Sequence, residues 1–128
     1  MPDGYLRQPV SNGVKKSGEI TVCFVNDEKI RKLNLRYLDK SSSTDVLAFD
    51  MSTPQEANSI FADIVVSVDM AIHNASLFKT TPLYELCLYV IHGALHLLGY
   101  EDRTIKGRKL MQLKAETILA KLKINRKD

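Results

Sequence analysis

The chain has 128 residues, of which 45% are hydrophobic, and its net charge is +3. This length suits one domain, and the composition excludes a disordered chain. No apolar run is long enough to span a membrane and the N-terminus lacks a signal-peptide core, so we expect one soluble, cytoplasmic domain over residues 1–128 with no membrane partner. The first 17 residues contain two prolines and two glycines, which predicts a loop or a flexible arm.

Positive charge is concentrated in the C-terminal segment. From Glu101 onward there are nine lysine or arginine side chains and four acidic ones, a balance of +5 that leaves −2 for the rest of the chain. A basic segment of this kind suits a partner with a phosphate backbone. A solvated helix with a basic C-terminal end has the same pattern, because the helix dipole favours cations there. Charge alone leaves both interpretations open.

Three strands and a helix are predicted in the first half of the chain. The alternating, β-branched segment GEITVCFVND at 18–27 predicts a strand. Asn26 and Asp27 can cap a helix that follows, whose apolar residues recur with roughly helical spacing at Ile30, Leu33, Leu35 and Leu38. After a serine-rich loop at 40–43, strands are predicted at 44–51 and 60–66, separated by a polar turn at 52–58.

Three helices are predicted to follow. The first covers 67–79 with Ser67 as its N-cap, and its expected packed face comprises Met70, Ala71, Ala75 and Leu77. The second starts with Thr81 as N-cap and Pro82 in the first turn, and Gly99 ends it. It is apolar on most sides, which predicts a central, buried helix. The third runs from about 104 to about 122, with inward residues expected at Leu110, Leu113, Ile118, Leu119 and Leu122.

This order of elements predicts an α+β (mixed α/β) fold in which a small sheet of three to four strands packs against helices.

Two histidines are spaced four residues apart on the predicted buried helix. His92 and His96 lie on one face of that helix, which is the spacing with which helical histidine pairs bind zinc. Asp102 follows the turn at Gly99 and can fold back toward them as a third ligand, leaving a fourth position for water. The alternative is a pair of hydrogen-bonded core histidines. A nearly all-apolar helix offers such rings few partners, which favours the metal.

Neighbouring residues restrict the chemistry of this site. Gly93 occupies the position that holds the general-base glutamate in H-E-x-x-H proteases, which disfavours that type of peptidase. Glu85 lies seven residues before His92 on the same face, where it is either a base that assists the site or an acid favoured by the helix dipole. His73 is interpreted as a surface or packing residue.

Three sequence blocks resemble the YbeY family. HGALHLLGYED at 92–102 is similar to its signature H-G-x-L-H-L-x-G-Y-D-H, and LN at 33–34 with TDVLAF at 44–49 and ADIVVS at 62–67 are similar to two further blocks. The resemblance implies a zinc-dependent endoribonuclease in which one Zn²⁺ ion, held by the catalytic residues His92, His96 and Asp102, activates water. It also implies single-stranded ribosomal RNA and the small ribosomal subunit as partners rather than DNA, in ribosomal RNA maturation and ribosome quality control.

The sequence departs from the family pattern at several positions. Asp102 replaces the third histidine of the signature, and Glu101, which replaces the preceding aspartate, is an alternative ligand. Aspartate binds zinc, but its charge also widens the choice toward harder metal ions. Leu38 replaces a family arginine, and Arg36 lies two residues away.

Two other functions are therefore kept open. The first is a non-catalytic ribosome- or RNA-binding assembly factor with a structural metal, and the second is a metal hydrolase with another substrate.

Overall fold

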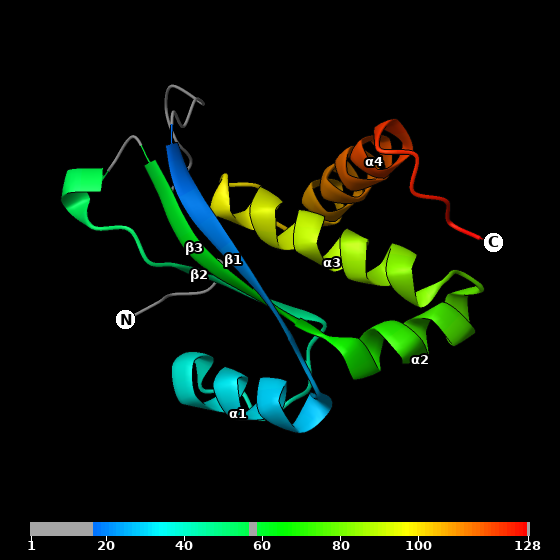
Figure 1. The fold of residues 1–128 in the computed structure, drawn as a ribbon, viewed down its shortest axis with the longest axis horizontal. Coiled ribbons are helices and arrows are strands. Elements are labelled where there is room, and N and C mark those ends of the chain that lie inside the picture. Colours follow the sequence, from blue (N-terminus) through cyan, green and yellow to red (C-terminus); the bar gives the residue numbers. More distant parts are fainter. Residues whose placement is uncertain (1–16, 57–58, 128) are drawn as a thin grey trace.

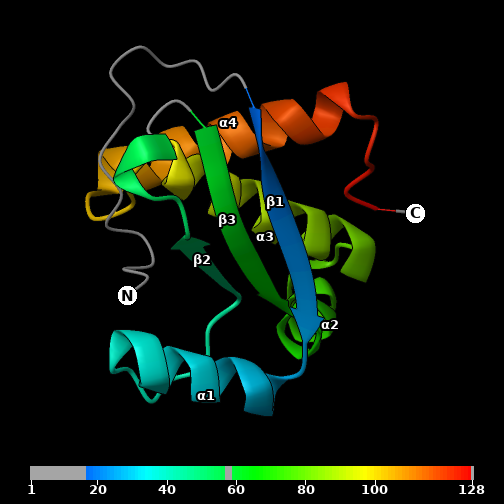
Figure 2. The ribbon, with the colours of Figure 1, turned by 60° about the vertical axis from the view of Figure 1, so that its left-hand side comes forward.

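A three-stranded mixed sheet forms the centre of the computed structural model, which describes residues 17–56 and 59–127. Strand β3 (Ser59–Ser67) lies in the middle, between β1 (Ser17–Val25) and β2 (Val46–Asp50). It pairs with β1 in parallel and with β2 in antiparallel orientation. Figures 1 and 2 show this arrangement from two sides. The predicted α+β fold and the order of its elements are confirmed. Residues 1–16 of the predicted arm lie outside the described residues, but Ser17 belongs to β1.

Each face of the sheet is covered by a different helix. Side chains alternate along a strand, so neighbouring positions of β2 point to opposite faces. Leu47 and Phe49 pack with Ile30 of α1 (Asp27–Leu38). Val46 and Ala48 join the larger core beneath α3 (Pro82–Leu97). In Figure 1, α1 lies below the sheet and α3 above it.

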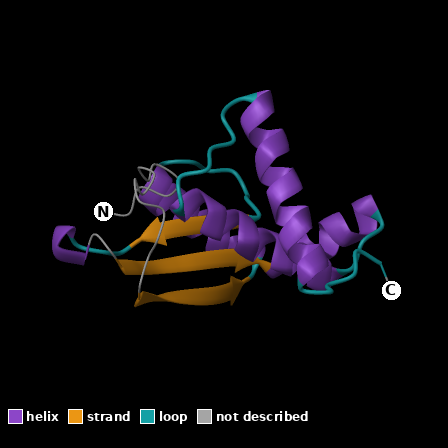
Figure 3. Ribbon diagram, turned by 90° about the horizontal axis from the view of Figure 1, so that it is seen from above, coloured by secondary structure: helices purple, strands orange, loops and turns teal. Residues whose placement is uncertain are grey.

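Helix α2 (Val68–Phe78) leads from β3 into α3, and α4 (Ile105–Lys121) packs chiefly against α3. Figure 3 shows α4 extending away from the layer of strands. The predicted turn at 52–58 contains a short 3-10 helix, η1 (Pro54–Glu56), and its residues 57–58 lie outside the described ranges. Among the described residues, no helix combines the length and the apolar character needed to cross a lipid bilayer.

Side-chain caps start all four α-helices found among the described residues. The predicted caps are confirmed at Asn26, Ser67 and Thr81, whose side-chain oxygens accept hydrogen bonds from the backbone N–H groups three residues later. Thr104 caps α4 in the same way, through a 2.9 Å hydrogen bond from the backbone nitrogen of Gly107. Each cap satisfies one of the backbone donors that a helix leaves free in its first turn.

The predicted inward faces of two helices were partly wrong. Four of the leucines expected in the core are exposed, namely Leu77 of α2 and Leu110, Leu113 and Leu122 at α4. The buried stripe of α4 is instead Met111, Ala115 and Leu119, which are spaced by four residues. Because α4 packs chiefly against one neighbouring helix, it buries only this narrow stripe and leaves the flanking leucines in solvent.

Helix α3 lies close to the sheet at Gly93. A β-carbon added there would lie 2.9 Å from Cγ2 of Ile64 and 3.3 Å from Cγ2 of Val46. Both neighbours are β-branched and buried in the core, so neither can move aside without a shift of the backbone.

Gly93→Ala is therefore expected to destabilise the protein by about 1–3 kcal/mol, the usual cost of overpacking a core. In a helix without this contact the same change would stabilise by about 1 kcal/mol, so the sign of the effect is diagnostic. Urea denaturation of the wild type and the variant measures the difference. A variant as stable as the wild type would show that α3 and the sheet are less closely packed.

Candidate metal centre

The three residues predicted to hold a metal line one cleft between α3, β2 and α4. His92 and His96 enter it from α3, and Asp102 enters from the turn that connects α3 to α4. The cleft has a volume of about 240 Å³, and its other lining residues are Asp45, Val46, Arg108, Met111 and Gln112.

The turn after α3 fixes the orientation of His96. Gly99 adopts a left-handed conformation with φ of 99°, which reverses the chain and places the backbone oxygen of Tyr100 3.1 Å from Nδ1 of His96. A carbonyl oxygen only accepts hydrogen bonds, so Nδ1 carries the proton in this contact. Nε2 is therefore the nitrogen left to act as an acceptor or ligand, and it lies 3.7 Å from Oδ2 of Asp102.

One ring nitrogen of His92, Nε2, is buried without a hydrogen bond to any of the described residues. Leaving a buried polar atom unpaired costs about 1–3 kcal/mol, and such atoms are rare in folded proteins. A ligand at this nitrogen would remove that cost.

Both histidines favour their neutral form. Burial lowers the pKa of His92, against the opposing influence of Asp45, Asp102 and Gln112. Burial also lowers the pKa of His96, although Asp102 and the carbonyl of Tyr100 act in the other direction. Neutral imidazole is the form that binds metal ions, so both rings are prepared for that role near pH 7.

The third ligand is less well placed. Among the described residues, no three histidine, cysteine, aspartate or glutamate side chains are grouped closely enough to hold a metal ion as they stand. The side chain of Asp102 is 53% exposed, so its carboxylate has room to reorient. Glu101, the alternative ligand, lines a separate hollow with Leu98 and Leu110 rather than the cleft. The donor set of two imidazoles and one carboxylate thus suits zinc once Asp102 turns inward, and Asp102 is better placed than Glu101.

Sequence reasoning missed two charged residues of the cleft, Asp45 and Arg108, and the polar Gln112. Asp45 precedes β2, and burial raises the pKa of its carboxyl despite the nearby His92. Its signal in the sequence was a single acid before the apolar run VLAF. Arg108 comes from the first turns of α4, and its Nη1 donates a 3.1 Å hydrogen bond to the backbone oxygen of Asp102. No local pattern announces Arg108, because only the turn after α3 brings it to the cleft.

Glu85 is buried but does not line the metal cleft. Its Oε2 accepts a 2.7 Å hydrogen bond from Oγ1 of Thr80, and Oε1 lies 3.4 Å from the hydroxyl of Tyr89. It therefore does not occupy the place of a general base beside the two histidines. His73 is exposed on α2, as predicted for a surface residue.

Position 38, where the resemblance to the family implies an arginine, lies outside the metal cleft. Leu38 packs with the cluster between α1 and the sheet, on the face away from α3. The guanidinium of Arg36 is exposed, with its carbon 5.3 Å from the ring centre of Tyr37. Neither residue lines the cleft, whereas Arg108 does.

The lowered histidine pKa values predict a pH-dependent stability for the metal-free protein. Below about pH 6.5, the ordinary pKa of histidine, the unfolded chain binds more protons than the folded one. The free energy of unfolding should therefore fall with decreasing pH, by at most about 1.4 kcal/mol per pH unit for each histidine. Urea denaturation of chelator-treated protein between pH 7.5 and 5.5, an interval of about one unit on either side of that pKa, measures the slope.

His92→Gln should reduce this slope, and His73→Gln, the same substitution at an exposed position of α2, is the matched control. Asp45 has a raised pKa and therefore changes the free energy of unfolding with pH in the opposite direction. The wild type and the variants are for this reason compared by the slope of that free energy against pH. Equal slopes for wild type and His92→Gln would contradict the assignment of a neutral, buried His92.

The family model and two of the most similar relatives by sequence agree on one family. The protein-family model described as Endoribonuclease YbeY matches residues 6–123. A protein named Endoribonuclease YbeY from Elusimicrobium minutum is 38% identical, and the match covers 84% of this chain and 76% of that protein. A protein of the same name from Desulforamulus reducens is 37% identical, and the match covers 91% of this chain and 80% of that protein. The solution structure of TM1509 from Thermotoga maritima has a TM-score of 0.56 at 26% identity, covering 89% of this chain and 76% of that one. The resemblance seen in the sequence is confirmed, and the chain belongs to the Endoribonuclease YbeY family.

Proposed function

We propose that this protein is a metal-dependent endoribonuclease that cuts single-stranded ribosomal RNA, with one zinc ion in the cleft of His92, His96 and Asp102. The observation that carries the proposal is the buried, unpartnered Nε2 of His92 beside a second histidine of fixed orientation. Family membership supports RNA as the substrate, since the matching relatives are named endoribonucleases. The proposed setting is ribosomal RNA maturation and ribosome quality control at the small subunit.

Polar residues of the cleft have separate roles in the proposed hydrolysis of the phosphodiester. A divalent ion bound there would lower the pKa of a water molecule and polarise a phosphoryl oxygen. The turn at Tyr100 holds His96 in the tautomer that leaves Nε2 toward the cleft. Asp45 supplies a carboxylate beside His92, which is the group best placed among the described acids to accept the proton of the attacking water.

Arg108 is the cleft's candidate for binding the phosphate. Its guanidinium is held by the backbone of Asp102, next to the proposed ligand, and its side chain lines the cleft. A positioned arginine stabilises the negative charge that grows on the phosphoryl oxygens during cleavage. Arg108 would thus supply the positive charge for phosphate binding that is missing at position 38, where the chain has a leucine.

A non-catalytic RNA-binding factor is the second candidate. Two observations favour it, namely the incompletely grouped ligand set and the absence of an arginine at position 38. A metal hydrolase acting on a different ester is distinguished from both by its substrate. The two experiments below separate the three functions.

Metal analysis is the first experiment. The purified protein, loaded with zinc and desalted, should contain close to one metal ion per chain. His92→Ala, His96→Ala and Asp102→Ala should each lose most of it, because each removes one of three ligands. Glu101→Ala and His73→Ala are the controls and should keep the metal. A wild type that binds no zinc after loading would refute the metal site, and loss in Glu101→Ala alone would move the third ligand by one residue.

Cleavage of single-stranded RNA is the second experiment. Arg108→Ala should lower kcat about 10²–10³-fold, the range found when one stabilising donor is removed from an active site, while the metal content stays unchanged. Lys109→Ala, an exposed neighbour on α4, is the charge-matched control and should retain activity. RNA binding without any cleavage by the metal-loaded wild type would favour the non-catalytic factor. Turnover of a simple ester but not of RNA would favour the other hydrolase.

A further inference from the structure

The metal cleft is one of three neighbouring hollows. The second hollow, of about 340 Å³, shares Asp45, His92 and Gln112 with the cleft. The third, of about 610 Å³, shares Tyr84 and Arg126 with the second. Because each hollow has lining residues in common with the next, the three are neighbours in a row along α3, and we call this row the α3 groove.

Two helices define the course of the α3 groove. Helix α3 contributes His96 and His92 at one end and Tyr84 at the other. Along α4, Arg108, Gln112 and Glu116 are spaced by four residues, so they form one row that passes from the cleft to the third hollow. The twelve residues from Tyr84 to His96 correspond to about 18 Å at the helical rise of about 1.5 Å per residue.

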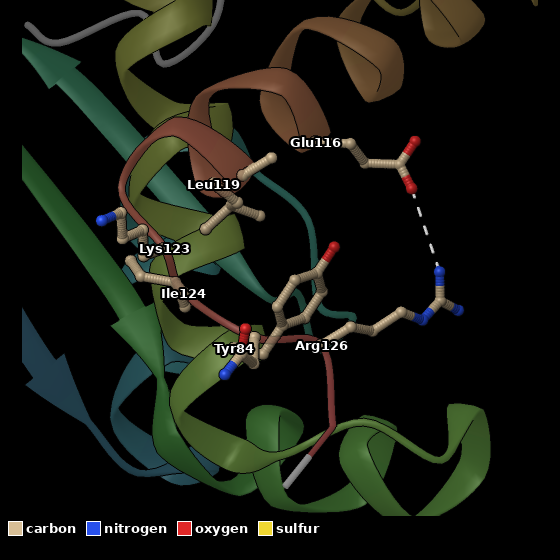
Figure 4. Close-up of a pocket in the computed structure, with 8 residues that line it drawn as sticks. Tyr84, Glu116, Leu119, Lys123, Ile124 and Arg126 are labelled. Carbon is tan, nitrogen blue, oxygen red and sulfur yellow. Dashed lines mark ion pairs between the residues drawn. The ribbon is translucent and has the colours of Figure 1, made fainter.

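The third hollow is lined by an arginine and by a tyrosine whose ring is buried. Figure 4 shows the hydroxyl of Tyr84 directed toward the space between Glu116 and Arg126. Arg126 Nη1 lies 3.9 Å from Oε2 of Glu116, and the two side chains are 57% and 40% exposed. An ion pair this long and this exposed contributes little, so the guanidinium can exchange Glu116 for a phosphate. Lys123 adds a second cation to the same hollow.

The second hollow has polar groups in fixed positions. Asn74 Nδ2 donates a 2.8 Å hydrogen bond to the hydroxyl of Tyr89, and Thr80 and Tyr89 hold the carboxylate of Glu85. The exposed ring of Phe78 stands at the rim of the same hollow. Fixed hydrogen-bonding groups and an accessible aromatic ring suit nucleobases, which stack on aromatic side chains at about 1–3 kcal/mol per base.

We propose that the α3 groove binds the RNA strand on one side of the bond that is cut, with Arg126 as a phosphate contact outside the metal cleft. The proposal rests on the proposed function and adds to it the path of the substrate. Phosphates follow the cations Arg108, Arg126 and Lys123, and bases face the exposed ring of Phe78. At the roughly 3.4 Å spacing of stacked nucleotides, 18 Å accommodates at most about five nucleotides on this side.

The test is binding of end-labelled single-stranded oligoribonucleotides of increasing length to the metal-loaded, full-length protein. Stopped-flow fluorescence anisotropy records binding before turnover. Arg126→Ala should weaken the binding of the longer oligonucleotides about tenfold, the value of one charge-assisted hydrogen bond, and should leave the shortest ones unaffected. The slope of log K against log salt should fall by about 0.7, the contribution of one phosphate contact in single-stranded RNA.

Two further variants make the test specific. Glu116→Gln removes the competitor of the phosphate and should strengthen the binding of long oligonucleotides. Lys127→Ala makes the same charge change as Arg126→Ala one residue away, outside the α3 groove, and should have little effect. Equal effects of Arg126→Ala and Lys127→Ala, or no effect of Arg126→Ala at any length, would overturn the proposal.

The outcomes also separate the groove from the nuclease activity. If the protein cuts RNA and Arg126→Ala has no effect, the proposed function stands and the proposal that the α3 groove binds RNA fails. If the protein binds long RNA through Arg126 but never cuts it, the α3 groove stands and the proposed catalytic function fails.

Discussion

Helix α3 lies so close to the sheet that no β-carbon fits between Gly93 and the side chains of Ile64 and Val46. This contact sets the depth at which the two neighbouring histidine positions are held. His92 comes directly before Gly93, and His96 follows one turn later on the same face. A bulkier residue at 93 would lift the helix from the strands and with it both imidazoles. The position that carries a general base in H-E-x-x-H proteases is here needed for packing, which explains why the base must come from another element.

The cleft around these histidines is built by segments that are far apart in the sequence. β2 brings Asp45, the turn at Gly99 brings Asp102, and the return of the chain in α4 brings Arg108. Burial keeps both imidazoles neutral while the nearby carboxylates stay close enough to oppose that effect. A cation would reconcile these opposing influences, since it satisfies the unpartnered nitrogen of His92 and offsets the negative charge of Asp45 and Asp102.

Local sequence rules predicted those features that local interactions determine. The caps Asn26, Ser67 and Thr81 were identifiable because a capping bond spans only three residues. The histidine pair was identifiable because its spacing equals one helical turn. Asp45 and Arg108 were missed because no periodicity relates them to His92, and their proximity exists only after β2 and α4 have packed. The leucines of α4 were misplaced for a related reason, since apolar content does not show how many neighbours a helix has, and α4 has chiefly one.

The narrow attachment of α4 has a consequence for the motions of the protein. Met111, Ala115 and Leu119 hold this helix to α3, while the leucines beside them are largely exposed. Helices with few buried contacts open at a lower free energy than the core to which they are attached. We therefore expect the amide hydrogens of the sheet and of α3, which carries both histidines, to exchange slowly, and α4 to open separately. Arg108, Gln112 and Glu116 belong to α4, so the wall of the cleft can loosen and admit a polymer while the histidine pair stays in place.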